Sequence, residues 1–114
     1  MLHILFGDPN RDLLRCYAVL LRGRGYAVTT VFDGAQVLEA LARQSFALAI
    51  LGDGLGRIGT KKLIPLLHEH GIPVLLLASG QAPTEADAVL PFPFLPQELY
   101  AAAEQILKKA GDPA

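Results

Sequence analysis

Short apolar runs and longer amphipathic segments alternate along the chain. Five runs rich in Val, Ile and Leu are bounded by turn residues and predict strands. They cover residues 2–6, 26–31, 46–51, 72–77 and 88–90. The third and fourth runs are almost continuously apolar, which is typical of strands buried on both faces of a parallel sheet.

Between these runs, apolar residues recur every three or four positions, the spacing of an amphipathic helix. Asn10 is a candidate N-cap for the first helix, and the other helices are expected near residues 37–45, 60–70 and 95–109. Pro65 fits the third helix only in a first turn, where its missing N–H costs little. The regular alternation of strand and helix predicts a parallel sheet with helices on both faces.

Length and composition narrow the class of protein. The 114 residues fit one domain, residues 1–114, and 52% hydrophobic residues can build a buried core. A net charge of −1 without a basic stripe gives no support for nucleic-acid binding, and no apolar run is long enough to cross a membrane. Cys16 is the only cysteine, so we expect a cytoplasmic protein, with Cys16 on the core side of a helix.

Several segments now carry a family pattern. In chain order they are ILFGD at 4–8, DLL at 12–14, RGYAV at 24–28, FDGAQVL at 32–38, the run 46–51, IPV at 72–74 and PF at 93–94. Together they resemble the receiver domain of two-component response regulators. The resemblance implies a flavodoxin-like three-layer αβα fold with a five-stranded parallel sheet in the order 2-1-3-4-5. It also implies a cis peptide bond before Pro93.

The family's phosphorylation site combines two acidic residues after the first strand, which hold Mg²⁺, with an aspartate that ends the third strand. Asp8 matches the first acidic position, but Pro9 stands at the second. The phosphoacceptor position falls on Gly52. Asp53 comes one residue later, where an extended chain turns its side chain to the other side.

The remaining family positions also depart from the pattern. In the family, a Ser or Thr after the fourth strand and a Lys before the last proline contact the phosphoryl group. Here Ala78 stands at the hydroxyl position, with Ser79 next to it, and Phe92 stands at the lysine position. Val89 aligns with the family's aromatic switch residue. The connection from 78 to 92 is short, so we expect the helix between the fourth and fifth strands to be shortened or absent.

We therefore expect a pseudo-receiver that is not an enzyme and holds no cofactor. It is expected to act through contacts with proteins of a signalling pathway, and these contacts include the formation of a homodimer. The resemblance implies a contact surface around the last helices, which here comprises residues 80–88, residues 91–94 and the last helix. The candidate residues there are Pro91, Phe92, Pro93, Phe94 and Tyr100.

Two alternatives stay open. One is a phosphorylatable receiver that uses Asp53, with Asp8 and Asp53 as weak candidate ligands of Mg²⁺. The other is a module that binds a small ligand at the carboxyl ends of the strands, as flavodoxins do.

Two further motifs fit a plainer interpretation. His68 and His70 lie two residues apart, so a helix turns them to different faces, and we expect a solvated helix end instead of a metal site. The glycine-rich segment 52–59 lacks the Lys-Ser/Thr spacing of a phosphate-binding loop.

Overall fold

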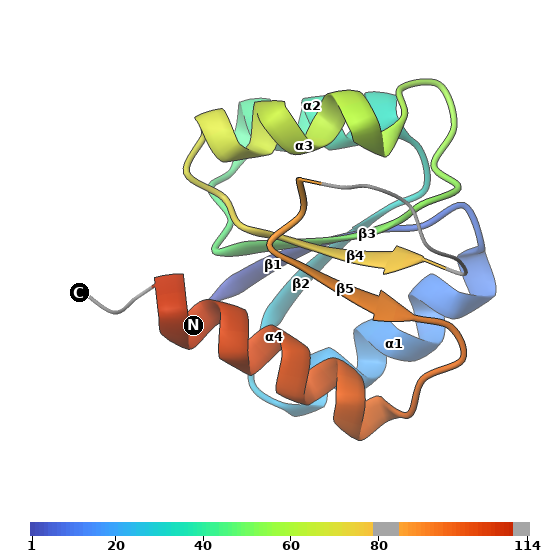
Figure 1. The fold of residues 1–114 in the computed structure, drawn as a ribbon, viewed down its shortest axis with the longest axis vertical. Helices are drawn as coiled ribbons and strands as arrows, with labels where there is room; N and C mark the ends of the chain where they lie inside the picture. The colour runs from blue at the N-terminus through green and yellow to red at the C-terminus, as the bar shows by residue number, and fades with distance from the viewer. Residues whose placement is uncertain (79–84, 111–114) are drawn as a thin grey trace.

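The computed structural model describes residues 1–78 and 85–110. Its elements follow one another as β1 (His3–Gly7), α1 (Arg11–Gly23), β2 (Ala27–Val31), α2 (Gly34–Arg43), β3 (Leu48–Gly52), α3 (Thr60–Glu69), β4 (Val74–Ala78), β5 (Ala88–Pro91) and α4 (Pro96–Ala110). All five strands run parallel in one sheet with the order β2-β1-β3-β4-β5 (Figure 1). The predicted order of the sheet is confirmed.

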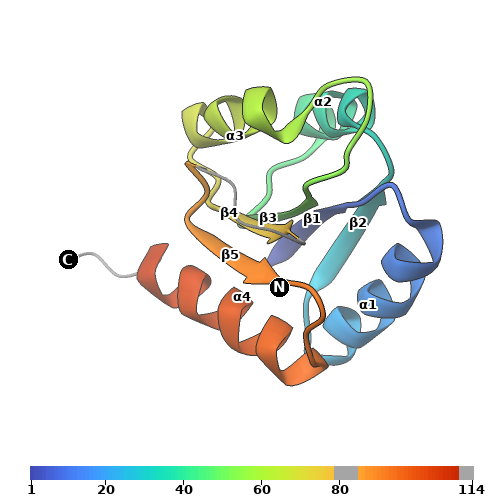
Figure 2. The ribbon, with the colours of Figure 1, turned by 45° about the vertical axis from the view of Figure 1, so that its right-hand side comes forward.

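The sheet is the middle of three layers. Helices α2 and α3 cover one face, and α1 and α4 cover the other (Figures 1 and 2). Each face has its own cluster of buried apolar side chains. Every residue of β3 and of β4 is buried, which explains the continuous apolar runs seen in the sequence. The flavodoxin-like three-layer fold is therefore confirmed.

Helix α1 begins where the sequence predicted. The Asn10 side chain accepts hydrogen bonds from the backbone N–H groups of Asp12 and Leu13, at 3.0 and 3.1 Å. These bonds satisfy two N–H groups that a helix start otherwise leaves without partners.

Two local expectations were wrong. Pro65 lies in the interior of α3, beyond its first turn, and it is tolerated because it faces solvent, where water can satisfy the carbonyl of Lys61 one turn earlier. Cys16 is exposed on α1, because Leu14, Ala18 and Leu21 form the side of that helix that faces the sheet.

The connection between β4 and β5 is short. Residues 79–84 of this connection, including Ser79, lie outside the described residues, and residues 85–87 are not helical. The described part of the chain contains four helices, so the expected loss of a helix at this point agrees with it. None of these helices is long and apolar enough to cross a membrane.

Candidate functional site at the carboxyl ends of β1 and β3

Asp8 lies directly after β1, at the edge of the sheet where the parallel strands end. Its backbone N–H donates to the carbonyl of Val31 at 3.1 Å, which holds it beside the end of β2. Only 5% of Asp8 is exposed, and it is the single buried charged or polar residue in the described part of the chain. The backbone N–H of Asn10 donates to Asp8 Oδ1 at 2.8 Å. The turn through Pro9 thus points this carboxylate inward.

The Asp8 carboxylate lies against Gly52, the last residue of the neighbouring strand β3. A Cβ atom built on Gly52 would lie 2.0 Å from Asp8 Oδ2 and 2.8 Å from Asp8 Cγ. Both distances are far below van der Waals contact, so any side chain at position 52 would collide with this carboxylate. Asp8 therefore fills the space that a side chain on the end of β3 would occupy.

Burial sets the protonation behaviour of Asp8. Removal from water raises the pKa of its carboxyl above the ordinary value of 3.8. The hydrogen bond from Asn10 opposes this change, and the negative charge of Asp53 adds to it.

Asp53 itself points out of the sheet. It is exposed, and its backbone N–H donates to the carbonyl of Leu77 on β4 at 2.9 Å. Pro9 is also exposed, and it lies beside Gly54, where its Cγ atom is 3.5 Å from a Cβ built on that glycine. The structure thus brings four of the sequence-selected positions to one place, namely Asp8, Pro9, Gly52 and Asp53.

Sequence reasoning missed the way the glycine-rich loop is anchored. The loop docks on the start of α2, where the Gly34 N–H donates to the carbonyl of Gly56 at 3.0 Å. A Cβ on Gly34 would lie 2.2 Å from the carbonyl oxygen of Ile58. Leu55 is buried under the loop, and Arg57 approaches Asp33 at 3.8 Å. The Asp33-Gly34 pair was the available signal, but it only indicated a turn.

Comparisons with known proteins identify the relatives of this chain. No protein-family model matches it. The transcriptional regulatory protein TctD of Salmonella typhimurium is 29% identical over 119 aligned positions, which cover 96% of this chain and 53% of TctD. The transcriptional activator protein PfeR of Pseudomonas aeruginosa is 35% identical over 97 positions, which cover 77% of this chain and 32% of PfeR. The chain thus spans about half or less of these relatives.

Solved structures agree on the fold. A two-component response regulator from Clostridium difficile superposes with a TM-score of 0.89 at 16% identity, covering 98% of this chain and all of that chain. This chain has the fold of response-regulator receiver domains, and it is similar in sequence to response regulators.

The other two positions that match the phosphorylation site of receiver domains are Ala78 and Phe92. Ala78 is buried, and its carbonyl accepts a hydrogen bond from the Phe92 N–H at 3.1 Å. The half-buried Phe92 ring packs on the core under α1 and α4, with its centroid 5.2 Å from that of Phe94. The Phe92–Pro93 peptide bond is cis, as the resemblance implied. Position 92 therefore offers an apolar ring in place of a cation.

The candidate contact surface divides into exposed and buried parts. Pro91 and Pro93 are exposed, and Phe92 and Tyr100 are half-buried. Phe94 differs from the expectation, because it is buried and packs against Tyr17 with ring centroids 5.2 Å apart. Phe94 thus belongs to the core and cannot offer its ring to a partner.

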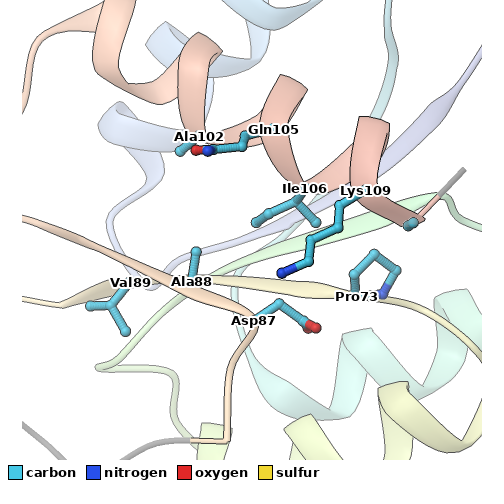
Figure 3. A pocket seen from close by; sticks show the side chains of 9 residues that line it. Pro73, Asp87, Ala88, Val89, Ala102, Gln105, Ile106 and Lys109 are labelled. Atoms are coloured by element: carbon cyan, nitrogen blue, oxygen red, sulfur yellow. The ribbon is translucent and has the colours of Figure 1, made fainter. Parts of the chain in front are cut away.

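The receiver-like domain also has a groove at the opposite end of its sheet. It measures about 550 Å³ and lies between α4 and the amino ends of β4 and β5, with Asp87, Ile106 and Lys109 among its lining residues (Figure 3). The small-ligand alternative placed its ligand at the carboxyl ends of the strands, so this groove gives that alternative no support.

Residues of metal-binding type do not gather in the described part of the chain. No group of three or more His, Cys, Asp or Glu side chains in residues 1–78 and 85–110 is arranged to hold a metal ion. His68 instead pairs with Asp87 at 2.8 Å, and His70 Nδ1 lies 2.9 Å from the carbonyl of Leu66. The two histidines therefore interact separately, as their spacing predicted.

Proposed function

We propose that this domain is a pseudo-receiver, which takes part in signalling through protein contacts without accepting a phosphoryl group. The observation that carries the proposal is the Asp8 carboxylate in the side-chain space of Gly52, with Oδ2 only 2.0 Å from a built Cβ. A receiver needs a nucleophilic carboxylate at this position. Here a carboxylate from the neighbouring strand stands against the backbone of the acceptor position.

The groups that would assist phosphoryl transfer are also replaced. Transfer requires cations to offset negative charge on the phosphoryl oxygens. Phe92 at the lysine position carries no charge, and Ala78 at the hydroxyl position has no donor. The chain therefore has no cationic or hydroxyl group at the two positions that contact the phosphoryl group in the family.

The donor set also does not fit Mg²⁺. This ion prefers near-octahedral oxygen ligands at about 2.0–2.1 Å, often one or two carboxylates with several waters. Asp8 Oδ1 already accepts the Asn10 N–H, Oδ2 lies against Gly52, and Pro9 supplies no second carboxylate.

A direct test uses a small phosphodonor such as acetyl phosphate with Mg²⁺, followed by intact mass measurement. We expect no phosphate adduct on the wild-type protein. An adduct that disappears in Asp53→Ala would overturn the proposal in favour of the phosphorylatable alternative. An adduct that persists in Asp53→Ala but disappears in Asp8→Asn would overturn it in favour of Asp8 as acceptor.

We further propose that the partner surface comprises Pro91, Phe92, Pro93 and Tyr100. These residues offer exposed proline rings and half-buried aromatic rings at the end of β5, in the connection that follows it and on α4. Aromatic residues are enriched in protein interfaces. If the partner is a second copy, sedimentation should give a mass that rises with concentration, and Tyr100→Ala should weaken the effect. A monomer mass at every concentration would exclude the homodimer and favour a different signalling protein.

A further inference from the structure

The turn after β3 presents an aspartate and a glycine to solvent. The Leu55 N–H donates to the carbonyl of Gly52 at 3.4 Å, so Asp53 and Gly54 are the two central residues of the turn. Both are exposed. An aspartate followed by glycine is the pair in which backbone attack on the side chain is least hindered, because glycine has no Cβ.

We propose that Asp53–Gly54 is a site of spontaneous covalent rearrangement to isoaspartate. The backbone nitrogen of Gly54 attacks Cγ of the protonated Asp53 carboxyl, a new N–Cγ bond forms, and the carboxyl OH leaves with the amide proton as water. Water then adds to the main-chain carbonyl carbon of Asp53 and breaks its bond to the Gly54 nitrogen. The released carbon becomes the new carboxylate, and the chain continues through the former side chain.

The local structure leaves both reacting groups free. Among residues 1–78 and 85–110, neither the Gly54 N–H nor the Asp53 carboxylate makes a hydrogen bond. The nearest atom to a Cβ built on Gly54 is Pro9 Cγ at 3.5 Å, so the surroundings do not crowd the ring that must close. An exposed turn also opens at low free-energy cost.

The second Asp-Gly pair of the chain, Asp33–Gly34, provides a built-in control. The Gly34 N–H donates to the Gly56 carbonyl at 3.0 Å, and Asp33 Oδ1 accepts the Gln36 N–H at 2.9 Å as the cap of α2. The backbone of Ile58 also packs directly on Gly34. Both reacting groups are engaged there, so the folded protein should protect this pair.

Rearrangement would change the candidate site. It lengthens the main chain by one methylene directly after Gly52 and shortens the arm that carries the carboxylate by the same amount. The Asp53 N–H holds the turn to Leu77 on β4, and the negative charge of Asp53 reaches Asp8. The altered turn would be a substrate for an enzyme that methylates isoaspartyl carboxylates, which is the class of partner this site implies.

The experiment incubates the folded full chain at mildly acidic to neutral pH for days and measures isoaspartate by enzymatic methylation. Peptide mapping then assigns the modified residue. A parallel sample unfolded in urea gives the reactivity of both Asp-Gly pairs without structure. We expect isoaspartate at Asp53 in the folded protein, a transient mass loss of one water, and strong suppression at Asp33 relative to the unfolded sample. Gly54→Ala should slow the reaction at Asp53 several-fold.

Two results would overturn the inference. One is suppression at Asp53 as strong as that at Asp33 in the folded protein. The other is an unchanged rate in Gly54→Ala, which would mean that the modification arises elsewhere. Isoaspartate has the same mass as aspartate, whereas a phosphate adduct adds mass. The two tests therefore succeed or fail independently of each other.

Discussion

Asp8 and Gly52 are complementary in shape, because the Asp8 carboxylate occupies the space that a side chain on Gly52 would need. The carboxylate needs a place near the end of the sheet, and the glycine leaves that place open. Interiors are packed so closely that a single added carbon is felt. The identity of residue 52 is therefore tied to the conformation of residue 8.

We predict that Gly52→Ala lowers the free energy of unfolding by about 1–3 kcal/mol, the usual cost of overpacking. Urea denaturation measures the change. Gly56→Ala in the same loop is the matched control, because no heavy atom lies within 4 Å of its built Cβ. Adding Asp8→Ala to Gly52→Ala should recover part of the loss, since the double mutant removes the colliding carboxylate. Equal effects of Gly52→Ala and Gly56→Ala would contradict the pairing.

A second residue-scale prediction concerns pH. Burial raises the pKa of Asp8 in the folded state, so the folded protein favours the protonated carboxyl. The ionised form therefore costs stability at neutral pH, and this cost disappears as the pH falls through the raised pKa toward the ordinary value of 3.8. Asp8→Asn should be more stable than wild type at pH 7, and the difference should shrink toward about pH 4.

Urea midpoints of the wild type and of Asp8→Asn across this pH range measure the stability difference and show whether it shrinks on acidification. Glu39→Gln, which removes an exposed carboxylate from α2, controls for the loss of one charge. A stability difference that widens on acidification would show that ionised Asp8 stabilises the fold.

At the scale of elements, the segment between β3 and α3 is a clasp on the start of α2. The clasp consists of the Gly34–Gly56 hydrogen bond, the packing of Gly34 on Ile58 and the approach of Arg57 to Asp33. Arg57 holds a left-handed backbone conformation with φ of 67°, which is uncommon for a residue with a side chain. These contacts fix the loop that follows the acceptor position.

We predict that Gly34→Ala opens this clasp. The new Cβ would lie 2.2 Å from the Ile58 carbonyl oxygen, and backbone cannot swing aside as a flexible side chain can. The expected loss of stability is about 3 kcal/mol, with faster amide exchange over residues 53–59. Gly59→Ala should change stability by less than about 1 kcal/mol, because its built Cβ meets no neighbour within 4 Å. Unchanged exchange in the loop of Gly34→Ala would argue against a clasp.

At the scale of the whole molecule, the sheet separates two cores, and the chain between β5 and α4 closes the one under α1 and α4. Phe94 lies in that core beside Tyr17, whereas the next residue, Leu95, is 62% exposed. Arg24 ties the same layer together, since its guanidinium pairs with Glu104 at 2.6 Å and lies 4.7 Å from the Tyr100 ring centroid.

We predict that Phe94→Ala costs about 3–5 kcal/mol through lost burial and a cavity. Leu95→Ala should stay within about 0.5 kcal/mol, because its side chain is mostly in water already. Thermal and urea unfolding of the two variants form a matched pair. A small loss in Phe94→Ala would instead support the original expectation that this ring is available to a partner.

Much of this architecture followed from the chain pattern. The continuous apolar runs of β3 and β4 predicted central strands, and Asn10 predicted the start of α1, because both signals are local. Cys16 and Pro65 were misjudged for the opposite reason. Each depends on which side of a helix faces the sheet, and the packing of the helix on the sheet decides that.

Residue identity and periodicity are sufficient to predict the order of strands and helices along the chain and the two buried strands. The departures at Pro9, Gly52, Ala78 and Phe92 follow from the residues at the positions that the family resemblance marks. Three features emerge only in the folded chain: Asp8 turns inward onto Gly52, the loop backbone packs on Gly34, and Phe94 is buried while Phe92 is only half-buried. These contacts join residues distant along the chain at separations of a few ångströms. Their existence depends on how the strands and helices pack, which no local pattern specifies.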